Sequence, residues 1–363
     1  MLVVDDSPVC REQLRELLEA ERDIEVVGEA GTGEEAVELV RQLKPDVTTM
    51  DVQMPGLGGL RAIEQIMAKT PVPILVVTGR PASAGADLAF EAVRRGALDL
   101  VEKPGPHDIR AGHGLRAFVR RFADVRVVRH VAGSRASASA EVPPPPKAGS
   151  VFRSPLPAGS RVPPAVMTVV GLGASAGGPL TVATVLAGVD PQARAAFALV
   201  QHLPLGFVNS FAEFLSRKIP QRVQVVRSQA PLEAGVVFLA ADDHHLAMAS
   251  PQTIASVQGP HVGGHRPSVN ALFQSLAEFV GPLGIGVILS GMGNDGAQGL
   301  RRMRAAGAYT IAQDEGSSIV YGMPRAAVEA GGVKTVLPLD LIAPILTALL
   351  SAPRMAIGKE GPW

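Results

Sequence analysis

A serine inside a glycine-rich turn is the first feature of this sequence that could do covalent chemistry. Ser175 follows the apolar run 166–170 and lies in the stretch Gly-Ala-Ser-Ala-Gly (173–177), which fits the G-x-S-x-G pattern of a nucleophile on a strand-to-helix turn. Glycine permits backbone torsions and close approaches that a side chain would prevent. A helix that starts near Pro179 would aim its amide groups at the same space and favour a developing anion. The turn therefore predicts a serine nucleophile for acyl transfer.

The same turn also fits a nucleotide-binding pattern. Residues 171–176 match G-x-G-x-x-G/A, the dinucleotide fingerprint, which calls for an acidic residue about 20 positions on, at the end of the next strand. The next apolar run, 197–201, ends instead in His202. A nucleotide-dependent oxidoreductase is thus an alternative, but the missing acidic residue at this strand end argues against it. A histidine at this position could instead serve as a general base.

A third strand end supplies an acid. The run 286–290 predicts a buried strand, and the glycine-bracketed turn 291–296 (Gly-Met-Gly-Asn-Asp-Gly) that follows it contains Asp295. In a doubly wound sheet, residues at the carboxyl ends of neighbouring strands converge on one crevice. A catalytic triad is recognised by geometry and roles and not by chain order. Ser175, His202 and Asp295 are therefore predicted to form one.

A second group of polar residues follows the strands of the first 122 residues. Apolar runs at 2–4, 24–27, 47–50, 74–77 and 98–101 alternate with amphipathic segments, which predicts a five-stranded α/β domain whose first strand is either short or starts upstream. The strand ends carry Asp5, Asp6, Asp51, Thr78 and Lys103. Carboxylate oxygens suit Mg²⁺, and an aspartate can act as a nucleophile to form an acyl phosphate. We therefore expect a magnesium-dependent phosphate site.

Four motifs of this domain, VDDSP (4–8), MDVQMP (50–55), VTG (77–79) and EKP (102–104), together resemble the response regulator receiver family. The resemblance implies that Asp51 accepts a phosphoryl group from a histidine kinase. It also implies that Asp6 binds Mg²⁺ directly, with Asp5 acting through water, Gln53 through its carbonyl oxygen, and Thr78 and Lys103 contacting phosphoryl oxygens. The sequence departs from the family at Gly58, where an aspartate is usual, and at Leu100, where an aromatic switch residue is usual. Phosphorylation should survive both changes.

Further motifs, at 173–178, 201–207, 265–269 and 291–296, resemble the chemotaxis protein-glutamate methylesterases, which join a receiver to a serine esterase. The resemblance implies that Ser175 attacks methyl esters of glutamates on chemoreceptor cytoplasmic helices, with His202 as base, Asp295 orienting it and the Met292 amide donating to the oxyanion. It also implies deamidation of receptor glutamines and inhibition by the receiver until Asp51 is phosphorylated. Asn270 stands where an aspartate is expected, which weakens a loop contact more than the chemistry.

The predicted organisation is α/β, with two doubly wound parallel-sheet domains. Residues 1–122 form a five-stranded flavodoxin-like receiver and residues 166–352 a Rossmann-like methylesterase domain, with a proline-rich, basic linker at 123–165 and a tail at 353–363. In the second domain we expect further strands at 223–226, 236–240 and 309–311, and helices at 180–186, 210–219 and 269–279. The apolar stretch 341–350 predicts a terminal helix introduced by Pro338 and capped by Asp340.

Bulk composition excludes several classes of protein. A chain of 363 residues suits two domains, and its 34 basic and 34 acidic side chains with 4% aromatics give no field or stacking platform for nucleic acid. One cysteine excludes an internal disulfide, and there is neither a signal peptide nor an apolar run of about 20 residues, so we expect a cytoplasmic protein without membrane insertion.

Two further expectations concern cofactors and catalysis. Surface or loop roles are expected for His244, His245, His261 and His265, and no cofactor for the catalytic domain. A non-catalytic receiver adaptor is the remaining alternative, and it would not need the three triad residues together.

Overall fold

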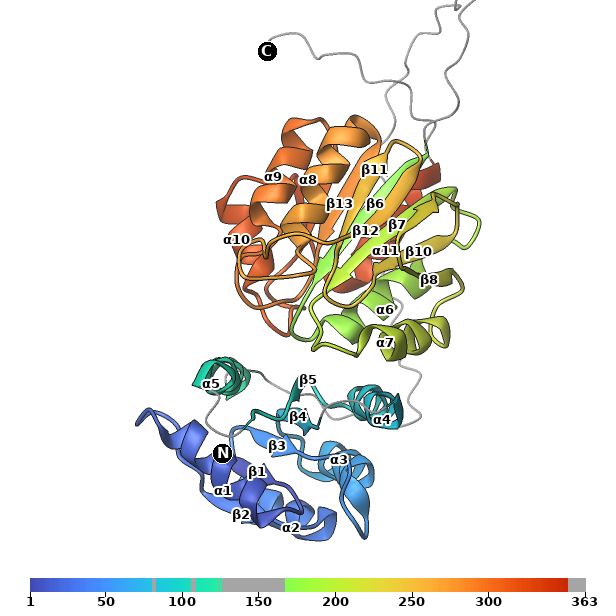
Figure 1. Cartoon of the computed structure of the whole chain (residues 1–363). Coiled ribbons are helices and arrows are strands. Elements are labelled where there is room, and N and C mark those ends of the chain that lie inside the picture. The colour runs from blue at the N-terminus through green and yellow to red at the C-terminus, as the bar shows by residue number, and fades with distance from the viewer. Residues whose placement is uncertain (80–82, 106–108, 124, 126–166, 352–363) are drawn as a thin grey trace, which may run out of the picture.

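The computed structural model describes residues 1–79, 83–105, 109–123, 125 and 167–351 (Figure 1). The predicted tail, and all of the predicted linker apart from Ala123 and Val125, lie outside these residues. The described chain forms two α/β units, each built on a parallel sheet, which confirms the predicted fold class.

The N-terminal unit is a five-stranded parallel sheet with helices on both faces, in the strand order β2-β1-β3-β4-β5. Its strands are β1 (Leu2–Val4), β2 (Gly28–Ala30), β3 (Thr48–Met50), β4 (Ile74–Thr78) and β5 (Asp99–Glu102). Its helices are α1 (Pro8–Glu19), α2 (Gly33–Leu43), α3 (Gly58–Lys69), α4 (Ser83–Arg94) and α5 (Ile109–Ala123). The predicted second strand, 24–27, was wrong because Ile24 and Val26 are buried by packing outside the ladder, and pairing with β1 begins only at Gly28.

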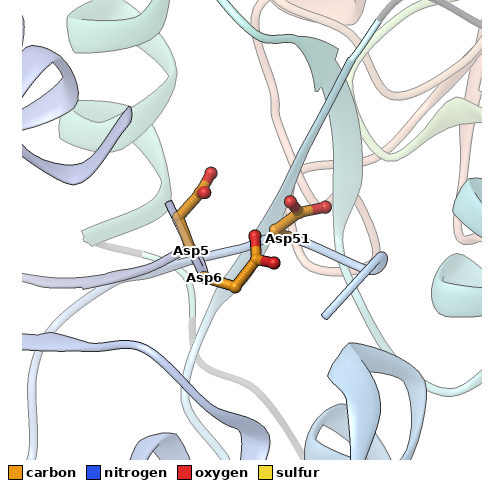
Figure 2. A group of neighbouring side chains, drawn as sticks. All are labelled: Asp5, Asp6 and Asp51. Carbon is orange, nitrogen blue, oxygen red and sulfur yellow. The ribbon is translucent and has the colours of Figure 1, made fainter. Parts of the chain in front are cut away.

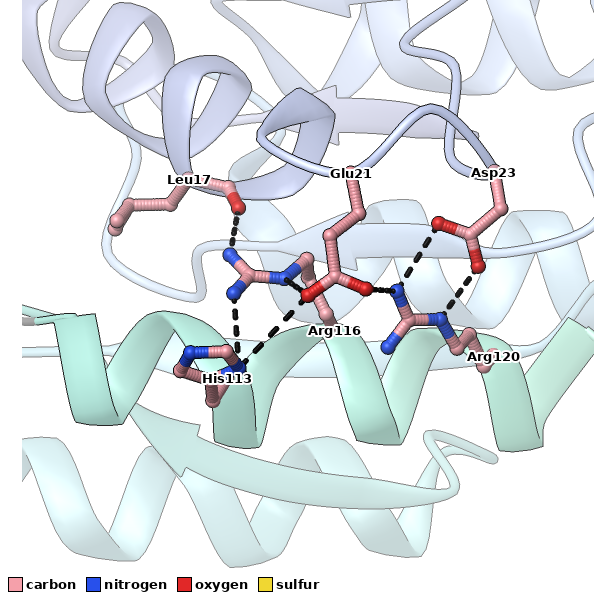
Figure 3. Close-up of polar contacts among 6 residues, drawn as sticks. All are labelled: Leu17, Glu21, Asp23, His113, Arg116 and Arg120. Atoms are coloured by element: carbon pink, nitrogen blue, oxygen red, sulfur yellow. Dashed lines mark hydrogen bonds and ion pairs between the residues drawn. The ribbon is translucent and has the colours of Figure 1, made fainter.

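Helix α5 is tied to the end of α1 and to the segment after it by arginines on one of its faces (Figure 3). Arg116 donates to Glu21 at 3.1 Å and to the carbonyl of Leu17, while Arg120 pairs with Asp23 at 2.6 Å and with Glu21. These contacts bridge residues almost 100 positions apart, so they fix the helix that closes the receiver sheet.

The C-terminal unit is a seven-stranded parallel sheet in the order β15-β14-β13-β6-β7-β10-β8. Its strands are β6 (Thr168–Ala174), β7 (Ala195–Gln201), β8 (Arg222–Val226), β10 (Val236–Ala240), β13 (Gly284–Ile288), β14 (Tyr309–Gln313) and β15 (Thr335–Leu337). A small antiparallel sheet of β9 (Gln229–Pro231), β11 (His245–Ser250) and β12 (Thr253–Val257) lies beside it. The six predicted strands are all present, whereas β15 and the small sheet were not predicted, because their strands are short or unevenly buried.

Helices cover both faces of the large sheet. They are α6 (Gly178–Gly188), α7 (Val208–Ser216), α8 (Val269–Phe279), α9 (Ala297–Ala305), α10 (Met323–Glu329) and α11 (Leu339–Ser351), with a short 3₁₀ turn, η1 (Gly281–Leu283). The terminal helix begins at Leu339, so Asp340 lies in its first turn and is not its N-cap as predicted. No helix within the described ranges is long and apolar enough to cross a membrane.

The strand order of the large sheet reverses at one point. From β6 the chain builds β7, β10 and β8 on one side and β13, β14 and β15 on the other. The order therefore reverses between β6 and β13, and in open α/β sheets the crevice outside the carboxyl ends of the strands at such a switch point is where ligands bind.

The receiver packs on this end of the C-terminal unit through α4, β5 and α5 (Figure 1). Phe90 of α4 lies among the rings of Phe207, Phe211 and Phe214. A second apolar cluster joins the receiver core to Ala176 and Val320, with Val101, Phe118, Met292 and Ile319 packed against it. The side of the receiver formed by α4, β5 and α5 thus covers the turn that follows Ser175.

Candidate active site and phosphorylation site

Ser175 is the first residue beyond the β6–β7 ladder, whose last pair is Ala174 with Gln201. The turn is held by the Ser175 amide, which donates to Ser290 O at 3.0 Å, and by the Gly178 amide, which donates to Ser175 O at 2.8 Å. The loop after β13 lies against it, because a Cβ on Gly291 would stand only 2.9 Å from Ser175 Cβ. The half-buried serine hydroxyl makes no hydrogen bond with any described residue, so it is free to react.

His202 and Asp295 come from two strands on opposite sides of β6 and meet. His202 Nε2 lies 3.0 Å from Asp295 Oδ2, and their side chains are 12% and 1% exposed. An ionised carboxylate only accepts hydrogen bonds, so Nε2 carries the proton and Nδ1 keeps its lone pair. Nδ1 is buried and has no hydrogen-bond partner among the described residues. The imidazole is therefore oriented by Asp295 and has one nitrogen free to take a proton.

Asp295 is held ionised by the start of helix α8. Its Oδ1 accepts from Ser268 Oγ at 2.8 Å, from Asn270 N at 3.0 Å and from Gly296 N at 3.0 Å, and its Oδ2 accepts from Val269 N at 2.7 Å. Burial raises the pKa of this carboxyl, but the hydrogen bond with His202 and those from α8 outweigh it and lower the pKa to about 2. Ser268 was not among the predicted site residues, although a serine before the predicted helix 269–279 is an N-cap signal.

His265 is a further neighbour of His202, and it lies in the motif 265–269 that carries part of the resemblance to the methylesterases. Its ring stacks on His202 with centroids 4.1 Å apart and an interplanar angle of 4°. Burial, and then the nearby His202, lower the pKa of His265, which keeps this ring neutral. His245 differs from the predicted surface or loop role, since it is a buried strand residue that accepts from Ser268 N.

The predicted oxyanion donor, Met292, lies in the loop that contacts Ser175, and its amide makes no hydrogen bond within the described residues. The amides of Ser175 and Gly178 are occupied by backbone carbonyls, so they are not available to an oxyanion. The Gly177 amide lies beside the buried carboxyl of Asp99, which comes from the receiver. Met292 remains a prediction.

The receiver acids gather at the carboxyl end of its sheet (Figure 2). Ligand oxygens of Asp5, Asp6 and Asp51 lie within 4.8 Å of one another. Lys103 Nζ lies 2.7 Å from Asp5 Oδ2 and 2.6 Å from Asp51 Oδ2. Burial lowers the pKa of Lys103, but these two carboxylates raise it to about 12 overall, so the ammonium stays charged.

This cluster fits the predicted chemistry of phosphate and Mg²⁺. Three carboxylates supply the hard oxygen ligands that Mg²⁺ prefers. Thr78 Oγ1, at the end of the neighbouring strand β4, is buried and has no partner among the described residues, so it is available to a phosphoryl oxygen. The backbone N–H of Gln53 donates to Asp51 Oδ1 at 3.0 Å, which fixes the carboxylate. Metal binding by the carbonyl oxygen of Gln53 stays a prediction.

The three departures from family patterns have structural counterparts. Gly58 has φ +71°, a conformation that suits glycine. Leu100 is buried in the core. Asn270 lies in the first turn of α8 and accepts from Gly299 N at 2.7 Å, so it links α8 to α9, while the expected weakening of a loop contact stays a prediction.

Comparison with known proteins assigns both units. A family model described as CheB methylesterase matches residues 170–346, and one described as response regulator receiver domain matches residues 1–111. The chain is 41% identical, over 96% of each chain, to the protein-glutamate methylesterase/protein-glutamine glutaminase 2 of Anaeromyxobacter dehalogenans. It is 39% identical, over 97% of each chain, to a protein of Agrobacterium fabrum with the same two activities in its name. A crystal structure of the Thermotoga maritima CheB methylesterase catalytic domain is 29% identical and covers 50% of this chain and 98% of its own, with a TM-score of 0.49.

Proposed function

Because this chain belongs to the receiver-linked protein-glutamate methylesterase family, we propose that it hydrolyses glutamate γ-methyl esters on chemoreceptors under the control of Asp51 phosphorylation. The observation that carries the proposal is the meeting of His202 and Asp295 at 3.0 Å at the strand ends that flank Ser175. The substrates are the cytoplasmic helices of methylated receptors, so the reaction takes place in the cytoplasm.

Acylation uses the free nitrogen of His202. Ser175 Oγ attacks the γ-carbonyl carbon, and its proton passes to His202 Nδ1 while the Asp295 carboxylate stabilises the imidazolium through Nε2. The Met292 amide donates to the oxyanion of the tetrahedral intermediate. Collapse breaks the bond to the methoxy oxygen, which takes the proton from His202 and leaves as methanol.

Deacylation reverses these roles. His202 takes a proton from water as the water attacks the glutamyl ester, and Ser175 leaves with that proton. Glutamine deamidation follows the same path with ammonia as the leaving group, which is the harder one. None of these steps requires a cofactor in the catalytic domain.

Phosphorylation uses the receiver cluster. A histidine kinase is the phosphodonor and Asp51 is the acceptor. Asp5, Asp6, Asp51 and Gln53 would hold Mg²⁺, and the bound ion would neutralise charge on the phosphoryl group. Thr78 and Lys103 contact the phosphoryl oxygens. The new charge lies at the carboxyl end of the receiver sheet. Strand β5 of the same sheet is in contact with the esterase unit.

Inhibition follows from where the receiver packs. It covers Ala176 and the Gly177 amide, the two residues after Ser175, and it fills the space beside α7 with Phe90. A receptor helix bundle is too bulky to reach Ser175 in this arrangement. Phosphorylation of Asp51 shifts the equilibrium towards a receiver conformation that packs less well here.

The test measures methanol released from methylated receptor membranes by the full chain, with and without beryllofluoride and Mg²⁺ as a phosphate mimic. We expect slow release without the mimic and fast release with it, a loss of at least about 10³ in Ser175→Ala, and slow release in Asp51→Asn under both conditions. Ser351→Ala, which alters an exposed serine in α11, is the control and should match the wild type. Rapid turnover by folded Ser175→Ala would overturn the nucleophile, and equal wild-type rates with and without the mimic would overturn receiver control.

A further inference from the structure

We propose that Gln201 is a positioning residue that fixes Ser175 and His202 relative to each other, an inference that rests on the proposed triad. Gln201 is the last residue of β7 and is 4% exposed. Its side-chain Nε2 donates to Ser175 O at 2.8 Å and to His202 O at 3.0 Å. One amide group therefore holds the backbone of both the nucleophile and the base.

The position of this contact explains its effect. Ser175 and His202 belong to different strands, and the β6–β7 ladder ends at the pair Ala174 and Gln201, one residue before each of them. Beyond that pair the backbone supplies one more bond across the two strands, from His202 N to Ala174 O at 3.0 Å. The two hydrogens of Nε2 continue the connection where the ladder stops, and they use both donors of the group.

The two carbonyls fix the orientation of the amide, because a flipped group would face them with its acceptor oxygen. Oε1 of Gln201 is buried and has no hydrogen-bond partner among the described residues. A Cβ on Gly178, at the start of α6, would stand 2.0 Å from this oxygen, so the glycine makes room for the glutamine. An unpaired buried acceptor costs free energy. The side chain is thus placed to satisfy the carbonyls of Ser175 and His202 and not its own oxygen.

The proposed role of Gln201 requires a hydrogen-bond donor and not only a side chain of this size. Gln201→Met keeps the length of the side chain but removes both donors. Gln201→Glu keeps the shape, and only its protonated form can donate a hydrogen bond, to one of the two carbonyls. When ionised, it faces two carbonyl oxygens with negative charge, so this variant should lose activity as the pH rises.

Gln221 offers a matched control within the same unit. It is also a buried glutamine whose Nε2 donates to a backbone carbonyl, that of Leu186 at 3.0 Å, and whose Oε1 has no partner in the described part of the chain. Gln221→Met therefore removes the same kind of bond away from Ser175 and His202.

The experiment uses the full chain activated with beryllofluoride and Mg²⁺, and measures kcat and KM for methanol release, labelling of Ser175 by a serine-reactive organophosphate, and Tm. We expect Gln201→Met to lower kcat and the labelling rate by about 10- to 100-fold, with KM within about twofold, because a small misplacement of reacting groups is costly. Gln221→Met should keep the wild-type kcat at a comparable Tm. In Gln201→Glu, kcat should fall with rising pH over a range where the wild type does not lose activity.

Two sets of results separate the inference from its premise. Wild-type kcat in Gln201→Met, equal losses in Gln201→Met and Gln221→Met, or a Gln201→Glu pH profile parallel to that of the wild type would overturn the role of Gln201. Labelling of wild type at a residue other than Ser175, or turnover by Ser175→Ala, would overturn the triad itself. If Gln201→Met does not fold, the pH profile of Gln201→Glu decides the matter within a single protein.

Discussion

The ring of Phe90 on receiver helix α4 stacks on the ring of Phe214 on helix α7, with centroids 5.5 Å apart and an interplanar angle of 30°. Phe207 and Phe211 complete the contact at 6.3 and 5.6 Å. All four side chains are buried, so this cluster is one of the apolar contacts that join the two units. A substitution of Phe90 should therefore weaken the packing of the receiver on the esterase without altering the Ser175 site or the Asp51 site.

Phe90→Ala should raise the methylesterase rate of the unphosphorylated chain. Aromatic pairs are worth about 0.5–1.5 kcal/mol each beyond the area that they bury, so closing should weaken by about 1–2 kcal/mol and the basal rate should rise about 5- to 30-fold. The rate with beryllofluoride is the control and should stay at the wild-type value. An unchanged basal rate in a folded variant would mean that this contact does not restrain the esterase.

Asp99 should make inhibition by the receiver depend on pH. It is buried at the start of β5, where its carboxyl accepts from Leu100 N at 2.8 Å and contacts the Gly177 amide. Burial outweighs these hydrogen bonds and raises the pKa of Asp99 to about 7. A released receiver exposes this carboxyl to water, so its pKa returns towards the ordinary range.

When the receiver is docked on the esterase (the closed arrangement), the Asp99 carboxyl therefore holds a proton that it gives up when the receiver is released. Closing is most favourable at low pH and weakens as the pH rises towards about 7, above which the effect is complete. The basal rate divided by the beryllofluoride-activated rate should rise over this range, by at most about tenfold per pH unit. Asp99→Asn cannot titrate and should give a low, flat ratio; a slope equal to that of the wild type would show that another group is responsible.

Asp295→Asn should nearly abolish activity while leaving substrate binding in place. All five groups around the carboxylate donate to it, so an amide NH₂ would face donors and would favour the wrong tautomer of His202. The same change in serine protease triads lowers kcat by about 10⁴, and we expect a similar loss here. Thermal unfolding should also occur at a lower temperature, because α8 loses part of its N-terminal anchor. A kcat within tenfold of the wild type would contradict the assignment.

His265 should act through the stacking of its ring on His202 and not through proton transfer. His265→Phe keeps a flat ring and should retain most of the wild-type kcat, whereas His265→Ala should lower kcat by about tenfold because His202 loses its support. Measuring kcat across pH for both variants checks this. If His265→Phe is as slow as His265→Ala, a nitrogen of His265 takes part in the reaction.

The sequence alone determined which residues are candidates for the chemistry and on which kind of element they lie. Ser175, His202, Asp295 and Asp51 could be proposed because a buried strand and the glycine or acidic turn after it are local patterns, read over about ten residues. The parallel arrangement of such strands then implies that their ends converge. The misplaced second strand of the receiver shows the limit, since buried apolar residues next to a sheet look the same as residues within it.

Only the tertiary structure decided how these residues are held and controlled. The four donors from Ser268, Val269, Asn270 and Gly296 to Asp295, the ring of His265 on His202, and the amide of Gln201 all depend on how α8, the small sheet and β7 pack around β6. The contacts of Phe90 with the rings of α7 and of Asp99 with Gly177 depend on the docking of two units that are separate in sequence. Such contacts join residues tens to hundreds of positions apart, and no local pattern encodes them, because they arise from the complementary shapes of packed surfaces.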